Sequence, residues 1–65
     1  MKIITKDNFG RDLFIEKVIA ENVNEFIGKE LVEQWNDKYW RSDSQYYLGL
    51  AEDDYELYDG YADLI

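Results

Sequence analysis

The sequence predicts a small α+β domain in which an antiparallel β-sheet carries one amphipathic helix packed on a face, in the order ββαββ. Three observations predict it. Two apolar, β-branched stretches near the N-terminus flank a glycine-containing turn, a central segment repeats its apolar residues every three or four positions, and the C-terminal third alternates them. We expect the 65 residues to form a single domain, 1–65.

The first two strands are expected at residues 2–6 and 12–20. Between them, Asp7-Asn8-Phe9-Gly10 supplies turn formers and a glycine that tolerates positive φ. In the second stretch, alternation divides the side chains between two sides: Leu13, Ile15 and Ile19 on one, and Asp12, Phe14, Glu16 and Val18 on the other. The pattern predicts a β-hairpin.

A helix is expected from Asn22 to about Trp40, since apolar residues recur with the spacing of one buried stripe. The stripe comprises Val23, Phe26, Ile27, Leu31, Trp35 and Tyr39. Asn22 with Glu25 three residues later resembles a capping box. Gly28 costs a helix interior about 1 kcal/mol relative to alanine, so we expect a neighbouring element to pack closely there.

The last two strands are expected at 46–51 and 55–58. Tyr46, Leu48 and Leu50 alternate with the residues that follow them, and a turn at Glu52-Asp53-Asp54 leads to the return strand. If Tyr55 and Leu57 face the helix, the remaining side chains project outward about 6.6–6.8 Å apart along the strand. This outward row holds Asp54, Glu56 and Tyr58, and Asp59 and Asp63 extend it.

Composition excludes several kinds of chemistry. The chain has no Cys and no His, so disulfides and thiol or imidazole catalysis are excluded and a structural zinc site is not expected. A calcium loop would need acids at Tyr55 and Leu57. We therefore expect no enzyme, no catalytic residue, no metal and no cofactor. The N-terminus lacks the apolar core of a signal peptide, and no stretch is long enough to span a bilayer, so we expect a cytoplasmic protein.

The negative charge is concentrated in the C-terminal third. All seven bases lie at or before Arg41, whereas seven of the fifteen acids follow it, and the net charge is −8. Such a protein repels nucleic acid and anionic membranes and favours a basic partner. A regular array of carboxylates also resembles the phosphates of a nucleic acid electrostatically. Tyrosine, which binding surfaces favour, is interspersed among these acids.

The sequence therefore predicts a surface that binds the basic groove of a nucleic-acid-binding protein and blocks it sterically and electrostatically. In this hypothesis the carboxylates pair with Arg and Lys of the partner, and a tyrosine anchors the centre. The candidate partner-binding residues are Asp53, Asp54, Tyr55, Glu56, Tyr58, Asp59, Tyr61 and Asp63.

In its size, its acidity, its lack of Cys and its strand–helix–strand plan, the chain resembles the small proteins that phages produce against host defence. It is most similar to anti-CRISPR proteins, which block RNA-guided nucleases. The Lys-, Ile-, Asn- and Tyr-rich stretches MKIITKDN and AENVNEF also suggest an AT-rich bacterial or phage genome. The resemblance implies a DNA mimic that acts on a CRISPR effector nuclease inside a bacterial host cell. It is one of character, so it assigns no contact residues.

An alternative remains open: a non-enzymatic interaction module, such as an antitoxin-like protein or a phage assembly partner. Its apolar, aromatic surface would then carry the contact, for example through homodimerisation along an exposed edge strand. Trp35, Tyr39 and Trp40 are expected in the core, although Trp40, near the helix end, is a better candidate for a contact residue than the other two.

Overall fold

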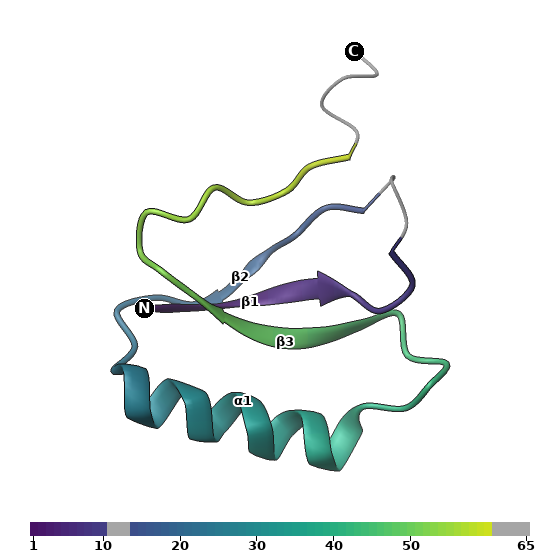
Figure 1. Cartoon of the computed structure of the whole chain (residues 1–65), viewed down its shortest axis with the longest axis horizontal. Coiled ribbons are helices and arrows are strands. Elements are labelled where there is room, and N and C mark those ends of the chain that lie inside the picture. Colours follow the sequence, from purple (N-terminus) through teal and green to yellow (C-terminus); the bar gives the residue numbers. More distant parts are fainter. Residues whose placement is uncertain (11–13, 61–65) are drawn as a thin grey trace.

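The computed structural model describes residues 1–10 and 14–60. Along the chain it contains strand β1 (Lys2–Asp7), strand β2 (Val18–Ala20), helix α1 (Glu25–Tyr39) and strand β3 (Tyr46–Ala51) (Figure 1). The strands form an antiparallel sheet in the order β2-β1-β3. The predicted α+β class, with one helix beside an antiparallel sheet, is confirmed.

The first strand lies at the centre of the sheet, and its register with β3 defines the two faces. Pairing runs from Lys2 opposite Ala51 to Asp7 opposite Tyr46. Because paired residues point to the same side, one face carries Ile3, Thr5, Leu48 and Leu50, and we call it the helix-side face. The other carries Lys2, Ile4 and Lys6, and we call it the lysine face. Ile3, Ile4 and Thr5 are all buried, so both faces of β1 contribute to the core.

Strand β2 joins β1 through a bulge. Ile3 pairs with Ala20 and Ile4 with Val18, so Ile19 is an extra residue in the ladder, and its side chain is 56% exposed. Beyond the bulge, the Thr5 hydroxyl accepts the backbone N–H of Lys17 and the Thr5 N–H donates to the Lys17 carbonyl, both at 2.9 Å. These bonds explain why a threonine is tolerated among the buried residues of β1.

The N-cap of the helix lies two residues later than predicted. Asn24 is the N-cap, and its Oδ1 accepts the backbone N–H groups of Phe26 and Ile27. Asn22 instead adopts a left-handed conformation with φ of 56°, which asparagine tolerates better than most residues. The next residue, Val23, donates its N–H to the Met1 carbonyl. That bond holds residues 22–23 beside the start of β1. Because Asn24 and not Asn22 is the N-cap, the predicted capping box at Asn22 and Glu25 is wrong.

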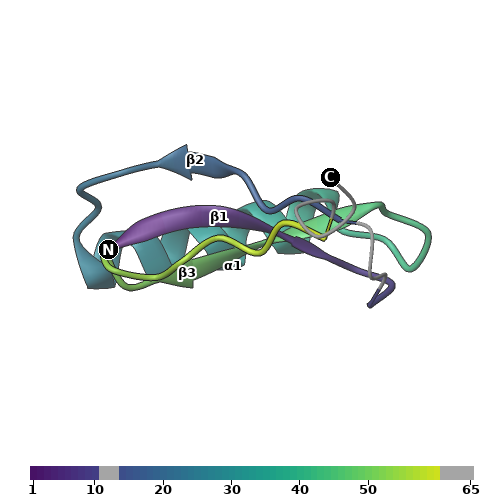
Figure 2. The ribbon, with the colours of Figure 1, turned by 90° about the horizontal axis from the view of Figure 1, so that it is seen from above.

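The side of α1 that faces the sheet also differs from the predicted stripe. Gly28 is buried, and Val32, Trp35 and Asn36 are half-buried. Four of the predicted core residues are exposed instead: Phe26 (82%), Ile27 (59%), Leu31 (50%) and Tyr39 (52%). Seen from above, α1 passes behind β1 and β3, on the helix-side face of the sheet (Figure 2). Gly28 and Asn36 lie against β3, and of the predicted stripe Trp35 stacks on Tyr46 of the same strand.

Gly28 allows this close approach. A Cβ atom at this position would lie 2.7 Å from Val23 Cγ1 and 2.8 Å from Leu50 Cδ1. Both distances are shorter than carbon atoms tolerate, so a larger residue at this position must displace the Val23 and Leu50 side chains or α1 itself. The expectation of a closely packed neighbour at Gly28 is confirmed.

Asn36 closes the outer edge of β3. Its Nδ2 donates to the Leu48 carbonyl at 2.9 Å, and its Oδ1 accepts the Leu48 N–H at 3.0 Å. One side-chain amide therefore satisfies the N–H and the carbonyl of Leu48, which a further strand would otherwise use at this position. An edge covered in this way is protected from pairing with another chain.

The predicted return strand at 55–58 is not formed, so the order is ββαβ. Both edges of β1 are occupied by β2 and β3, and Asn36 occupies the outer edge of β3. The segment after β3 instead reaches the residues that precede β2, where Ile15 and Asp59 form an isolated antiparallel bridge. Tyr55 contacts Lys6 of β1 rather than the helix, and Leu57 is exposed.

The edge contact of Asn36 yields a testable prediction. Asn36→Ala leaves the Leu48 N–H and carbonyl without their partners, and we expect it to lower the free energy of unfolding by about 1–2 kcal/mol. Urea unfolding followed by tryptophan fluorescence measures the change. Gln34→Ala removes an exposed amide from the same helix and is expected to change the free energy by less than about 0.5 kcal/mol. Equal losses in the two variants would contradict a role for Asn36 at the edge.

Candidate functional site

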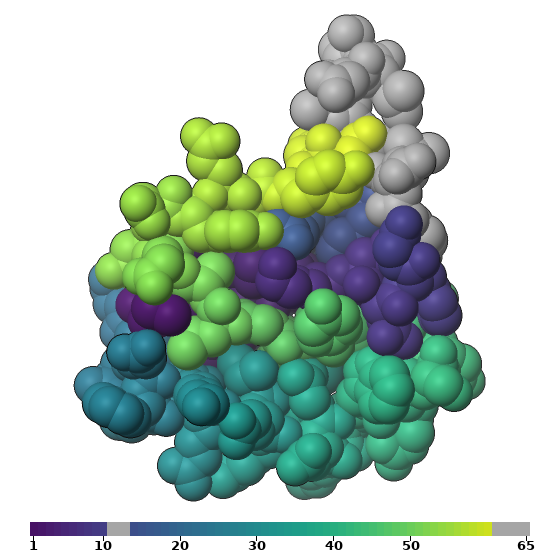
Figure 3. All heavy atoms as spheres, in the orientation of Figure 1, coloured from purple at the N-terminus to yellow at the C-terminus, as the bar shows by residue number. Residues whose placement is uncertain are grey.

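The candidate site is the acidic segment, residues 52–59, which follows β3. It runs along the rim of the molecule that lies opposite α1, shown in yellow-green in Figure 3. Its carboxylates lie on exposed residues: Glu52, Asp53, Asp54, Glu56 and Asp59. The concentration of acids in the sequence therefore becomes a concentration in space along one rim.

Asp53 fixes the beginning of the acidic segment. Its Oδ1 lies 2.9 Å from the N-terminal amine of Met1, which also donates to the Val23 carbonyl at 3.0 Å. The Asp53 side chain is 75% exposed, so this ion pair adds little free energy. It does place the turn at the end of β3 beside the start of β1.

Tyr55 attaches the middle of the segment to the lysine face of the sheet. Its carbonyl accepts from Lys2 Nζ at 2.8 Å, and its hydroxyl donates to Glu16 Oε1 at 2.8 Å. Lys6 Nζ lies 3.5 Å from the same hydroxyl and 5.1 Å from the centre of the ring. Hydrogen bonds and a cation–π contact thus act on a single half-buried side chain.

Glu16 is the buried carboxylate that connects these groups. Its Oε1 accepts both the Tyr55 hydroxyl and the Tyr58 N–H at 2.8 Å, and its Oε2 lies 3.7 Å from Lys6 Nζ. The residue is only 8% exposed. We call Lys6, Glu16 and Tyr55 the Glu16 cluster. Burial without such partners would be costly for a carboxylate, so the cluster requires the acidic segment to stay in place.

The charge of Lys6 is favoured within this cluster. Partial burial by itself lowers the pKa of Lys6, but the hydrogen bond to the Tyr55 hydroxyl and the charges of Tyr55, Glu16 and Tyr47 outweigh it. The net result is a pKa above the ordinary value of 10.5. Lys6 is therefore a cation at neutral pH and compensates Glu16.

Backbone hydrogen bonds hold the end of the segment. The Glu16 N–H donates to the Tyr58 carbonyl at 2.8 Å, and the Gly60 N–H donates to the Phe14 carbonyl at 2.9 Å. They flank the bridge between Ile15 and Asp59. The segment is thus fixed at Asp53, at Tyr55 and at residues 58–60, while its other acids remain exposed.

The structure places most of the predicted partner-binding residues on one short stretch. Asp53, Asp54, Glu56, Tyr58 and Asp59 are exposed. Tyr55 is half-buried and its hydroxyl is already engaged, which makes it a support of the segment. Tyr61 and Asp63 lie outside the described residues.

Trp40, the other aromatic contact candidate, lies away from the acidic segment. It is 41% exposed, and its Nε1 donates to Asn8 Oδ1 at 3.0 Å. With Asn8, Asn36 and Tyr47 it lines an open hollow of about 290 Å³. This hollow lacks a titratable pair, and the amide of Asn36 is committed to Leu48.

Neither a metal centre nor a membrane span emerges from the described part of the chain. Within residues 1–10 and 14–60, no three carboxylates lie close enough together to hold a metal ion. Across the same residues, no helix has the length and apolar character needed to cross a bilayer.

Comparison with known proteins supplies no relative. No protein-family model, no curated protein and no solved structure matches the chain. The case for a function therefore rests on the geometry of the chain itself.

Sequence reasoning missed the residues that support the acidic segment, namely Lys2, Lys6 and Glu16. Glu16 was assigned to the side of its strand that also holds Phe14 and Val18. A carboxylate that alternates with two apolar residues is the signal that marks it as a buried acid. Its partner Tyr55, in contrast, lies so far along the chain that no local pattern connects the two.

Proposed function

We propose that this protein is a non-enzymatic inhibitor whose acidic segment occupies the nucleic-acid-binding surface of a basic partner. The observation that carries the proposal is the combination of a fixed backbone with exposed charge. Tyr55 and Tyr58 bind Glu16, whereas the neighbouring Asp54 and Glu56 are exposed. A preorganised array of charge loses less entropy on binding than a flexible tail does.

The chemistry of the surface supports a partner that normally binds phosphate. Lys and Arg side chains in a nucleic-acid groove would find carboxylates in place of phosphates, and the attraction would accelerate association. The resemblance to anti-CRISPR proteins makes a defence nuclease of the bacterial host the partner class we propose. Blocking such a groove requires no catalytic residue in the inhibitor.

Affinity capture from nuclease-treated bacterial lysate tests the proposal. We expect a basic nucleic-acid-binding enzyme to be retained at about 50 mM salt and released at about 0.5 M, because screening weakens contacts between exposed charges. Neutralising two exposed acids with Asp54→Asn and Glu56→Gln should lower retention about tenfold, as a loss of about 1.4 kcal/mol implies.

The matched control neutralises two acids elsewhere. Glu33→Gln with Asp37→Asn makes the same chemical changes on exposed residues of α1 and gives the same net charge. We expect it to retain the partner nearly as well as the unchanged protein does. Equal losses in the two double variants, or a partner that resists 0.5 M salt, would contradict the acidic segment as the binding surface.

A second candidate function is an interaction module that binds through its apolar surface. It is favoured by the exposure of Ile19, Ile27 and Leu31, three large aliphatic residues of β2 and α1. A partner bound in this way would be retained by the Asp54→Asn, Glu56→Gln variant and at high salt. The same capture experiment therefore separates the two functions.

A further inference from the structure

The attachment of the acidic segment to the rest of the protein converges on Glu16, which precedes β2. Glu16 Oε1 accepts the Tyr55 hydroxyl and the Tyr58 N–H, and the Glu16 N–H donates to the Tyr58 carbonyl, all at 2.8 Å. Because these three bonds share one buried residue, the loss of any of them disturbs the geometry of the others. We therefore expect the segment to attach and detach as a unit.

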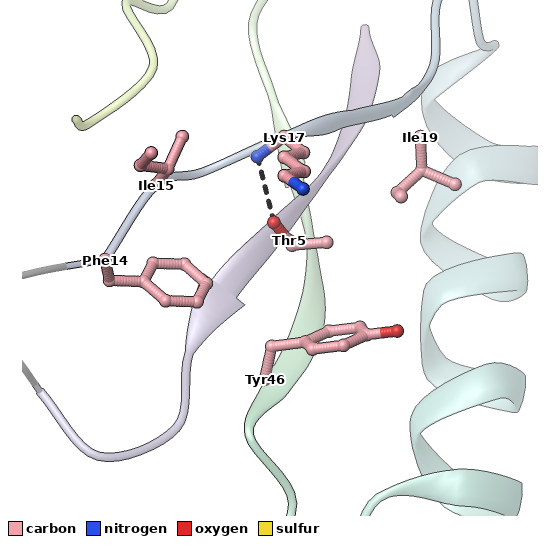
Figure 4. A pocket seen from close by; sticks show the side chains of 6 residues that line it. All are labelled: Thr5, Phe14, Ile15, Lys17, Ile19 and Tyr46. Carbon is pink, nitrogen blue, oxygen red and sulfur yellow. Dashed lines mark hydrogen bonds between the residues drawn. The ribbon is translucent and has the colours of Figure 1, made fainter.

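The stretch that receives the acidic segment is itself held to β1 at Lys17. Figure 4 shows the Lys17 N–H donating to the Thr5 hydroxyl of β1, and the Thr5 N–H donates to the Lys17 carbonyl. Phe14 and Ile15, drawn in the same view, come before Lys17 in the chain, and the Phe14 carbonyl accepts the Gly60 N–H at 2.9 Å. The bonds of residues 14–16 to the segment can thus break while Lys17 stays on β1.

The sheet and the helix do not depend on these contacts. The acidic segment reaches β1 through the side chains of Lys2 and Lys6, whereas the backbone of β1 pairs with β2 and β3. The contact of α1 with β3 is made elsewhere, at Gly28 and Asn36. Detachment of the segment therefore leaves the pairing of β1 with β3 and the packing of α1 in place.

Detachment nevertheless exposes buried surface. Ile4 is 0% exposed and lies on the lysine face between Lys2 and Lys6, which both bind Tyr55. Tyr55 therefore lies across Ile4, on the side of the sheet opposite α1. When the segment leaves, Ile4, the Tyr55 ring and the Glu16 carboxylate become exposed. Such an event is the unfolding of one part of the protein, and its free energy falls with urea concentration.

We propose that the acidic segment detaches from the lysine face as one cooperative unit, held by Glu16, while the sheet and α1 stay folded. The protein then has two forms of opposite surface character. The attached form presents the fixed acids, and the detached form presents Lys2, Ile4 and Lys6. A ligand that binds only the detached form would withdraw the acidic surface. As regulation of that surface the inference rests on the proposed function, but the detachment itself does not.

Amide hydrogen exchange, followed by NMR at low urea concentrations, tests the proposal and needs no partner. The probes are the amides of Glu16, Tyr58 and Gly60, which donate the hydrogen bonds between the segment and residues 14–16. We expect the three to share one protection factor and one dependence on urea. That protection factor should be at least tenfold below those of the amides that pair β1 with β3. Loss of partner capture with this pattern intact would contradict the proposed function alone.

Two variants distinguish detachment from unfolding of the whole protein. Asn36→Ala weakens a contact that the detached form keeps. It should lower the protection of the β1–β3 amides about tenfold and change that of Glu16, Tyr58 and Gly60 less than twofold. Tyr55→Phe removes a hydrogen bond that only the attached form makes. It destabilises that form relative to both others, so it should lower the protection of both groups about tenfold.

Tyr39→Phe is the matched control for Tyr55→Phe, since it removes the hydroxyl of an exposed tyrosine of α1. We expect it to change every protection factor less than twofold. If Asn36→Ala lowered the protection of both groups equally, the segment would open only with the whole protein and the proposal would be overturned. Different urea dependences at Glu16, Tyr58 and Gly60, or equal effects of Tyr39→Phe and Tyr55→Phe, would also overturn it.

Discussion

Replacing Glu16 with alanine is expected to lower the free energy of unfolding by about 2–3 kcal/mol, because hydrogen bonds to a buried charged group contribute more than neutral ones. The variant removes the acceptor of the Tyr55 hydroxyl and the Tyr58 N–H, and it leaves Lys6 with a side chain only 32% exposed and no carboxylate beside it. Urea unfolding measures the loss. The exchange rate of the Tyr58 amide, which should rise sharply, reports detachment of the acidic segment.

The control for this variant is Glu56→Ala, which removes an exposed carboxylate from the acidic segment itself. We expect a change below about 0.5 kcal/mol and no faster exchange at Tyr58, since isolated surface charges contribute little to stability. If Glu16→Ala and Glu56→Ala had similar effects, the Glu16 cluster would not be what fixes the segment. A stable Glu16→Ala protein with reduced partner capture would instead show that rigidity of the segment matters for binding.

Gly28→Val is expected to destabilise the protein by about 2–3 kcal/mol, the cost of overpacking a well-packed contact. Even the Cβ atom would lie within 2.8 Å of Val23 and Leu50 side-chain carbons, and valine adds two methyl groups beyond it. The usual gain in helix propensity on replacing glycine is under about 1 kcal/mol and does not offset this clash. Thermal unfolding followed by circular dichroism measures the change.

Lys29→Val tests whether the effect of Gly28→Val comes from the contact with β3. It introduces the same β-branched side chain at the adjacent, exposed position of α1. We expect a loss below about 0.7 kcal/mol, which reflects helix propensity alone. A similar loss in both variants would mean that valine disfavours this helix wherever it stands. A neutral Gly28→Val would mean that α1 shifts away from β3 without cost.

Local pattern predicted the elements of the fold well. The alternation of Tyr46, Leu48 and Leu50 places these residues on one side of β3, as the pairing with β1 shows. The antiparallel pairing of the first two strands and the existence of α1 are also confirmed, but β2 covers only Val18–Ala20 of the predicted strand at 12–20, of which residues 12 and 13 lie outside the described residues. What local pattern did not predict was the competition for edges. Residues 55–58 can form a strand only beside a strand whose backbone groups are free. At the outer edge of β3, the side chain of Asn36 binds the backbone of Leu48.

The orientation of α1 shows a second limit of sequence reasoning. Hydrophobic periodicity selects the most apolar side of a helix, here Phe26, Ile27 and Leu31, and assumes that it faces the core. In the structure Gly28 and Asn36 also lie against β3, although they contribute nothing to an apolar pattern. Phe26, Ile27, Leu31 and Tyr39, which the pattern predicted to be buried, are therefore exposed.

The candidate site was predicted in part. The exposure of Asp54, Glu56 and Asp59 follows directly from their charge. The hydrogen bond between Tyr55 and Glu16, which fixes the acidic segment, could not be predicted in this way. The two residues are separated along the chain by α1 and β3. A buried carboxylate with a distant partner leaves no periodic trace in a single sequence.

The central position of β1 has a consequence for how the protein forms. Strand β1 is synthesised first and pairs with both other strands. Its main partner, β3, is the last of the three to be synthesised, so Lys2 cannot pair until Ala51 has been added to the chain. Closing such distant pairs is slow relative to forming local ones. Ile3 and Ile4 are therefore expected to be buried only once β3 is available to pair with β1. A chain that stops short of β3 lacks the main partner of its central strand and is not expected to fold.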